Sequence, residues 1–164
     1  MQGTRHLRGV ARRSQGWYNH EPIQRAGDPT TMPTIHPLAL ACTAVLGVLL
    51  FGLGLVVSLM RGKTQVLIGV TDDPDHILNR IVRVHGNTAE YAPFLALLFL
   101  LCGARQPGPL VLGLIVAATA GRLIFVAGLL SARTLRRPSL LRFVGSALTY
   151  GCGMALSVIA ATGA

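Results

Sequence analysis

The feature that most constrains this chain is an uncharged apolar run of 23 residues, Leu38 to Met60. A helix needs about 20 apolar residues to cross the hydrocarbon of a bilayer. Two further runs, residues 109–130 and 139–161, are similar in length and carry one arginine each. Only 13% of the chain is charged, against roughly 25% in soluble domains. The sequence therefore predicts an integral membrane protein.

A fourth segment, residues 75–101, is polar in its first half and fully apolar in its second. We expect Asp75 to be the N-cap of its helix, because Pro74 holds the preceding chain extended. Short links join the four segments, so neighbouring segments should be antiparallel. Residues 32–164 are therefore predicted to form one domain of an all-α membrane protein, an antiparallel bundle of four transmembrane helices.

Residues 1–31 differ in composition from everything that follows. They contain five arginines among Gly, Gln, Asn and Pro, and they show no helical or strand periodicity. We expect a disordered extension, because so little apolar surface cannot stabilise a fold. No apolar stretch follows the arginines before Pro33, which excludes a secretory signal peptide, whereas an Arg-rich transit peptide is an alternative. A third interpretation is that the biological start is Met32.

The basic residues gather at the ends of the apolar segments. The links after the first and third segments share one side of the membrane and hold five of them: Arg61, Lys63, Arg133, Arg136 and Arg137. The opposite side holds only Arg105, if the chain begins at Met32. The positive-inside rule then predicts that the basic links are cytoplasmic. The net charge of +9 therefore indicates membrane topology, and we expect no nucleic-acid partner.

A polar stripe occupies one face of the segment 75–101. On a helix of about 100° per residue, its members fall within roughly 80° of arc: Arg80, Arg83, Asn87 and Glu90. His85 lies off this stripe. A charge in hydrocarbon costs at least ~2.5–3.5 kcal/mol, so a stripe that enters a membrane segment indicates a function.

Arginines of the other three segments are predicted to reach the same membrane layer as the stripe. Arg61 ends the first segment, Arg122 lies two turns before the end of the third, and Arg142 lies in the first turn of the fourth. Converging arginines bind carboxylates in bidentate geometry, and they hold thiolates ionised at neutral pH. A small anionic thiol such as glutathione carries both groups.

Purely structural roles are the alternative for these charges. Arg83 and Glu90 can neutralise each other, and Arg122 can pair with Asp72 or Asp73. A small transporter or channel is another interpretation, since intramembrane charge is typical of both. However, the second half of segment 75–101 is uncharged, and the other segments offer no polar path across the membrane.

The chain resembles the MAPEG family, the membrane-associated proteins of eicosanoid and glutathione metabolism, over roughly Met32 to the C-terminus. The resemblance rests on a pattern in the second of four segments: Arg80-x-x-Arg83-x-His85-x-Asn87-x-x-Glu90-Tyr91-x-Pro93. The opening Met32-Pro33-Thr34 is similar to that of small bacterial members. The resemblance implies a four-helix subunit in a homotrimer, here in a bacterial inner membrane, with glutathione as co-substrate between subunits near the cytoplasmic face.

The resemblance also implies which residues contact glutathione. Together with Arg122 from the arginine layer, they are Arg61, Arg83, His85, Asn87, Glu90 and Tyr91. An arginine near the start of the fourth helix activates the thiol in the eukaryotic enzymes. We place this role at Arg142, which lies inside the segment, and keep Arg136 as the alternative because its spacing from the third segment fits some members better.

The third segment departs from the family pattern. The eukaryotic enzymes follow its arginine with tyrosine or histidine and then a second tyrosine about one turn later. This chain has Phe125 and Leu129 instead, and both hydroxyls are missing. The departure weakens the case for glutathione binding and leaves the fold assignment unchanged.

The sequence thus predicts a membrane-embedded, glutathione-dependent transferase or peroxidase that acts on lipophilic electrophiles. The alternative is a non-catalytic protein on the same scaffold, with a role in assembly, lipid binding or regulation. The chain contains no P-loop or HExxH motif. Its three cysteines form no C-x-x-C pair, so we expect no metal site.

Overall fold

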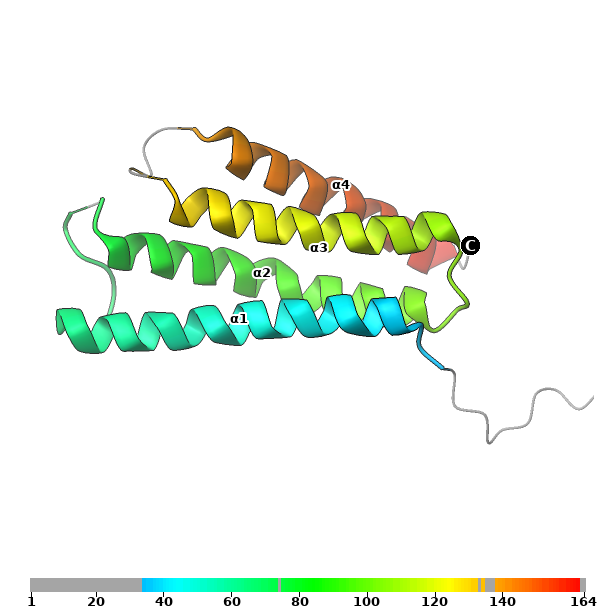
Figure 1. Ribbon diagram of the computed structural model, residues 1–164, viewed down its shortest axis with the longest axis horizontal. Helices are drawn as coiled ribbons and strands as arrows, with labels where there is room; N and C mark the ends of the chain where they lie inside the picture. Colours follow the sequence, from blue (N-terminus) through cyan, green and yellow to red (C-terminus); the bar gives the residue numbers. More distant parts are fainter. Residues whose placement is uncertain (1–33, 74, 133, 135–137, 163–164) are drawn as a thin grey trace, which may run out of the picture. The chain divides into compact units, whose positions relative to one another are not determined.

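The computed structural model describes residues 34–73, 75–132, 134 and 138–162. This part of the chain forms four helices and no strand: α1 (Pro37–Thr64), α2 (Ile77–Gly103), α3 (Pro109–Leu130) and α4 (Leu140–Thr162). Each helix runs antiparallel to the one before it (Figure 1). The prediction of an all-α membrane bundle is confirmed. The predictions for residues 1–31, and the possible role of Arg136, concern positions outside the described residues.

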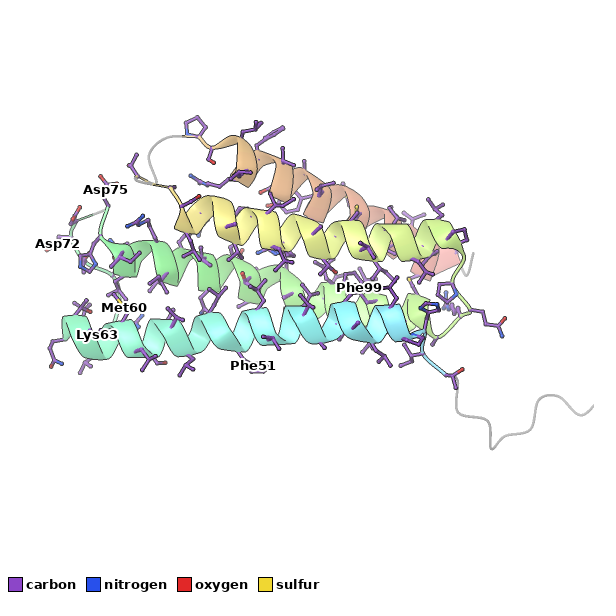
Figure 2. The ribbon with its side chains drawn as sticks, viewed as in Figure 1. Phe51, Met60, Lys63, Asp72, Asp75 and Phe99 are labelled. Carbon is purple, nitrogen blue, oxygen red and sulfur yellow. The ribbon has the colours of Figure 1, made fainter. Side chains whose placement is uncertain are left out.

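Three of these helices, α1, α3 and α4, are long and apolar enough to cross a membrane. The polar stripe lowers the mean hydropathy of α2, yet its 27 residues span about 40 Å at ~1.5 Å per residue. The outer face of α1 is strongly apolar, and Phe51 is 78% exposed. Its side chain projects away from the other helices, as expected for a surface that contacts lipid (Figure 2).

The start of α2 differs from the prediction. Its N-cap is His76, whose Nδ1 accepts a hydrogen bond from the Leu78 amide at 3.1 Å, so Asp75 is not the cap. The backbone amide of Asp75 instead donates to Oδ1 of Asp73 at 3.0 Å, which places Asp75 in the turn of the preceding link. Pro93 lies inside α2 and does not end it.

The interior of the bundle contains two apolar clusters with polar residues between them. The larger cluster includes Phe99 and Ile115, and the smaller one includes Val84 and Phe125. Four buried polar side chains of α2 and α3 fall between the positions that belong to the two clusters: Asn87, Thr88, Thr119 and Arg122. We call these four residues the polar layer.

Glycines bring α3 and α4 into backbone contact. A Cβ atom built at Gly121 would lie 2.8 Å from the Cβ of Leu148, and one built at Gly128 would lie 2.7 Å from the Cβ of Leu141. At Gly145 the neighbours are backbone atoms of α3. Small residues at such positions let membrane helices approach closely. This contact fixes the position of α4 along α3.

The link between α1 and α2 is held by two buried or half-buried polar side chains. Asn79 donates to the carbonyls of Thr71 and Asp73, each at 2.8 Å, and its Oδ1 accepts from the Thr71 amide at 2.8 Å. Arg61 donates to the carbonyls of Leu67 and Gly69 at 2.6 and 3.2 Å. These hydrogen bonds attach the described residues of the link to α1 and α2.

Replacing Asn79 with alanine is expected to release this link. The change removes three hydrogen bonds to backbone groups, each worth about 0.5–1.5 kcal/mol, so the local loss should be about 2–4 kcal/mol. Hydrogen exchange of the Thr71 amide should accelerate, while exchange in α3 stays the same. Asn79→Asp, which keeps the acceptor and loses both donors, should give an intermediate rate. Unchanged exchange in Asn79→Ala would contradict this account.

Candidate functional site

Arg122 is the centre of the polar layer. Its side chain is 1% exposed, and one Nη donates to Oδ1 of Asn87 at 2.9 Å and to Oγ1 of Thr88 at 3.3 Å. Its Nε is buried and has no hydrogen-bond partner among the described residues. No carboxylate of the described chain lies within salt-bridge distance of the guanidinium, so the expected alternative pairing with Asp72 or Asp73 is absent there.

Two aromatic rings contact this guanidinium. The ring of Phe125 lies 4.9 Å from the guanidinium carbon and the ring of Tyr91 lies 5.5 Å from it. Tyr91 in turn packs against Tyr150 of α4, with 5.3 Å between ring centroids. Ring faces stabilise a cation without neutralising its charge. Among the described residues the guanidinium therefore has hydrogen bonds and ring contacts but no salt bridge.

The structure separates the members of the polar stripe. Asn87 is buried against Arg122, whereas Arg83 and Glu90 are exposed on the surface of the bundle. Within the described residues no salt bridge joins Arg83 to Glu90. Charged residues within membrane-spanning segments usually pair with one another or face a cavity or the interior of a bundle.

Other basic residues of the expected layer lie at the same end of the bundle, where α1 and α3 end and α2 and α4 begin. Arg80 donates to the carbonyl of Ala132 at 2.5 Å, just beyond the end of α3. Arg61 holds the link that follows α1. Arg142 is half-buried, and its backbone lies against Gly128 of α3, about 9 Å along the helix from Arg122.

His85 faces a different direction from Asn87. A Cβ atom at Gly54 of α1 would lie 3.2 Å from Nε2 of His85, so the imidazole packs where α1 has no side chain. The imidazole is half-buried. The structure thus brings Asn87, Tyr91 and Arg122 together within the bundle and places His85 against α1.

A groove runs along the surface between α2 and α4, with a cavity volume of about 600 Å³. It begins at Tyr91 and Tyr150, and its walls include Leu98, Gly153 and Val158. No charged side chain lines it. Because Tyr91 contacts Arg122, one end of the groove adjoins the polar layer.

Sequence reasoning overlooked Thr88 and Tyr150. The signal for Tyr150 was present, because it is the only aromatic hydroxyl in residues 139–161. Thr88 gave no signal, since a hydroxyl next to Asn87 has no distinctive spacing. The substituted positions of α3 are both inside: Phe125 is 9% exposed and Leu129 is 1% exposed.

These features define an integral membrane protein, a four-helix bundle with a buried arginine that forms no salt bridge with the described residues. The model of the MAPEG family matches residues 39–162, and the chain belongs to this family. The family comprises membrane proteins of glutathione-related transferase and peroxidase chemistry, and its members generally use glutathione. A search of curated proteins found no significant match.

Proposed function

We propose that this protein is a membrane-embedded glutathione-dependent transferase or peroxidase that acts on lipophilic electrophiles. The single observation that carries the proposal is the buried guanidinium of Arg122, whose hydrogen-bond partners among the described residues are the neutral side chains of Asn87 and Thr88 and which forms no salt bridge with them. A cation buried without a counter-charge is unfavourable by several kcal/mol, whereas one that binds an anionic ligand gains a charge-assisted hydrogen bond. Glutathione, which the family generally uses, is an anion with carboxylates and a thiol.

The exposed members of the stripe support a site that is completed by a second subunit. Arg83 and Glu90 have opposite charges, and both lie on the outer surface of α2. Glutathione has carboxylates for an arginine and an ammonium group for a glutamate. In a homotrimer these side chains, with Asn87 and Tyr91, would contact glutathione from one subunit.

Glutathione would lie near the cytoplasmic face of a bacterial inner membrane, because the positive-inside rule places the basic end of the bundle there. The electrophile would enter from the bilayer. The buried positions of Phe125 and Leu129 favour the second candidate, a non-catalytic protein on this scaffold, because neither position supplies a hydroxyl.

Two measurements on the purified protein separate the candidates. Adding glutathione should produce thiolate absorbance at neutral pH, and saturating glutathione should raise the melting temperature. At 100 times the dissociation constant, binding stabilises by ~2.7 kcal/mol. Thiolate absorbance together with a thermal shift would support the enzyme. A flat response in both measurements would favour the non-catalytic scaffold.

The thiol-activating arginine can be identified by charge removal. Arg142→Gln should raise the pKa of bound glutathione by about 1–3, because a neighbouring cation stabilises the thiolate. Thiolate absorbance should then be lost at neutral pH and should return at higher pH. Arg136→Gln is the matched comparison. An unchanged titration in Arg142→Gln, with the upward change in Arg136→Gln, would move the role to Arg136.

A further inference from the structure

The link between α1 and α2 carries an apolar surface that the described residues leave open. Leu67 is 74% exposed, Ile68 is 90% exposed and Val70 is 57% exposed. Residues 64–71 have no charge, and they separate Lys63 from Asp72. Exposed apolar side chains that adjoin one another are typical of a surface that contacts a membrane or another protein.

This link runs back along α1 instead of continuing away from it. Gln65, the C-cap of α1, has φ 54° and ψ 23°, the left-handed conformation that commonly ends a helix. Five extended residues span about 17 Å, so residues 65–69 could carry the chain far beyond the helix. The carbonyl of Gly69 nevertheless accepts a hydrogen bond from Arg61 at 3.2 Å. Figure 1 accordingly shows the link beside the last turns of α1.

Arg61 lies at the level of the membrane surface. It is the first charged residue after the uncharged run 38–60, and an arginine in this position extends its guanidinium to the lipid headgroups. Because the carbonyls of Leu67 and Gly69 contact this guanidinium, the link backbone lies at the headgroup level too. Asp72 and Asp75, by contrast, lie at the outer edge of this end of the bundle (Figure 2). The charges of the link therefore face water, and its apolar part lies next to the hydrocarbon.

Side chains of the protein satisfy the backbone carbonyls along the link. The donors are the side chains of Gln65, Arg61 and Asn79. The carbonyls that accept from them are those of Gly62, Leu67, Gly69, Thr71 and Asp73. Non-helical backbone close to hydrocarbon requires such internal donors, because lipid chains offer no hydrogen bonds. A link surrounded by water has no need of them.

We propose that residues 66–70 form a membrane anchor, in which Leu67, Ile68 and Val70 insert into the boundary between lipid headgroups and acyl chains. Apolar side chains of interfacial segments enter this boundary by about 5–10 Å. The partner is the lipid leaflet at the basic end of the bundle, and neutral lipid suffices because the anchor has no charge. The anchor fixes the depth of this end in the bilayer. It belongs to the fold and does not depend on the proposed function.

The test is electron paramagnetic resonance of a nitroxide spin label on Ile68→Cys, in the full chain in phosphatidylcholine nanodiscs. Molecular oxygen concentrates in hydrocarbon and a neutral nickel chelate stays in water, so their relative access to the label reports its depth. We expect the ratio of oxygen to nickel access to be several-fold higher than for Asp72→Cys, the matched control on the exposed part of the same link. The buried Cys42, Cys102 and Cys152 should not react, and the parent chain measures the background.

Either of two results would overturn the anchor. A label at position 68 that is as accessible to nickel as the label at position 72 lies in water. A label shielded from both reagents is covered by a second copy of the chain or by another protein. If Ile68→Cys does not assemble, Leu67→Cys gives the same measurement at a second exposed position.

The hydrogen bonds of Arg61 are tested on the same labelled chain. Adding Arg61→Gln to Ile68→Cys should raise nickel access to the label several-fold, because the carbonyls of Leu67 and Gly69 lose their donors and require water. Asn79 still holds the far end of the link, so the label at position 72 should change little. An unchanged depth at position 68 would contradict the role that we give to Arg61.

Discussion

Replacing Arg122 with methionine is expected to weaken glutathione binding about 10–100-fold while the four-helix bundle remains assembled. The guanidinium is 1% exposed and has no carboxylate partner in the described chain, so its removal strands no buried anion. Apolar replacements of buried charged groups are often neutral or stabilising by 1–4 kcal/mol. Against this, the side-chain oxygens of Asn87 and Thr88 each lose a hydrogen-bond donor. Each unsatisfied oxygen destabilises the bundle by about 1–3 kcal/mol. We therefore expect a small net change in stability.

A clear loss in affinity should accompany this small change in stability. A hydrogen bond to a charged group contributes about 1.5–3 kcal/mol, so the dissociation constant for glutathione should rise about 10–100-fold. Maleimide reaction of the buried cysteines on heating reports unfolding, since Cys42, Cys102 and Cys152 are all buried. Isothermal titration on the same sample reports binding.

Arg122→Lys is the matched control for the charge. It keeps the cation and loses the fork of donors, so binding should be intermediate. Glutathione affinity within twofold of the parent in Arg122→Met would show that this arginine has no role in binding the ligand. A large loss of stability in Arg122→Met, with no ligand present, would mean that the arginine is structural.

Replacing Gly145 with valine is expected to separate α3 from α4. A Cβ atom at this position would lie 2.5 Å from the backbone N of Phe125, 2.7 Å from the carbonyl oxygen of Gly121 and 2.8 Å from the Cα of Phe125. All three are backbone atoms of α3, so no side-chain rotation relieves the overlap. Overpacking typically costs 1–3 kcal/mol, and we expect about 3 kcal/mol or more here because the helix itself must move.

Gly151→Val is the matched control, because the same side chain at Gly151 meets no neighbour within 4 Å. Heating with maleimide should show an early transition in Gly145→Val and a parental transition in Gly151→Val, because Cys152 of α4 becomes accessible as the helices part. The glutathione response should also fall in Gly145→Val. The new side chain displaces the backbone of Phe125, and the ring of Phe125 contacts the guanidinium of Arg122. Equal transitions in the two variants would contradict the close contact that we describe.

The helices themselves were predictable because hydrophobicity acts locally. The run of residues 38–60 is apolar enough to predict a membrane helix without knowledge of its packing partners. The helix α3 has the predicted bounds, residues 109–130. The start of α2 was not predictable from the Asp75 and Pro74 signal. A neighbouring aspartate accepts the amide of Asp75, and His76 becomes the cap. Local competition between two equally plausible caps decides such a boundary.

The sequence predicted which residues belong to the candidate site but not how they are arranged in space. Asn87 and Glu90 are one helical turn apart and share a face by simple periodicity, yet only Asn87 lies inside the subunit. The edge of the interface with α3 runs between them. The partner of Arg122 was also undecided, because Asp72 and Asp73 were as reasonable as Asn87 until α2 and α3 were placed side by side.

The amino-acid sequence by itself determined the membrane class, the four helices and the family, because each of these depends on local hydropathy or on one pattern within a single helix. The tertiary structure alone decided that Arg122 is held by Asn87 and Thr88, and that Tyr91 meets Tyr150 at the end of a groove. Helices such as α1 and α3 are apolar around most of their circumference, so their sequences do not indicate which face packs inward. Close backbone contact at glycines such as Gly145 determines which faces of α3 and α4 pack together.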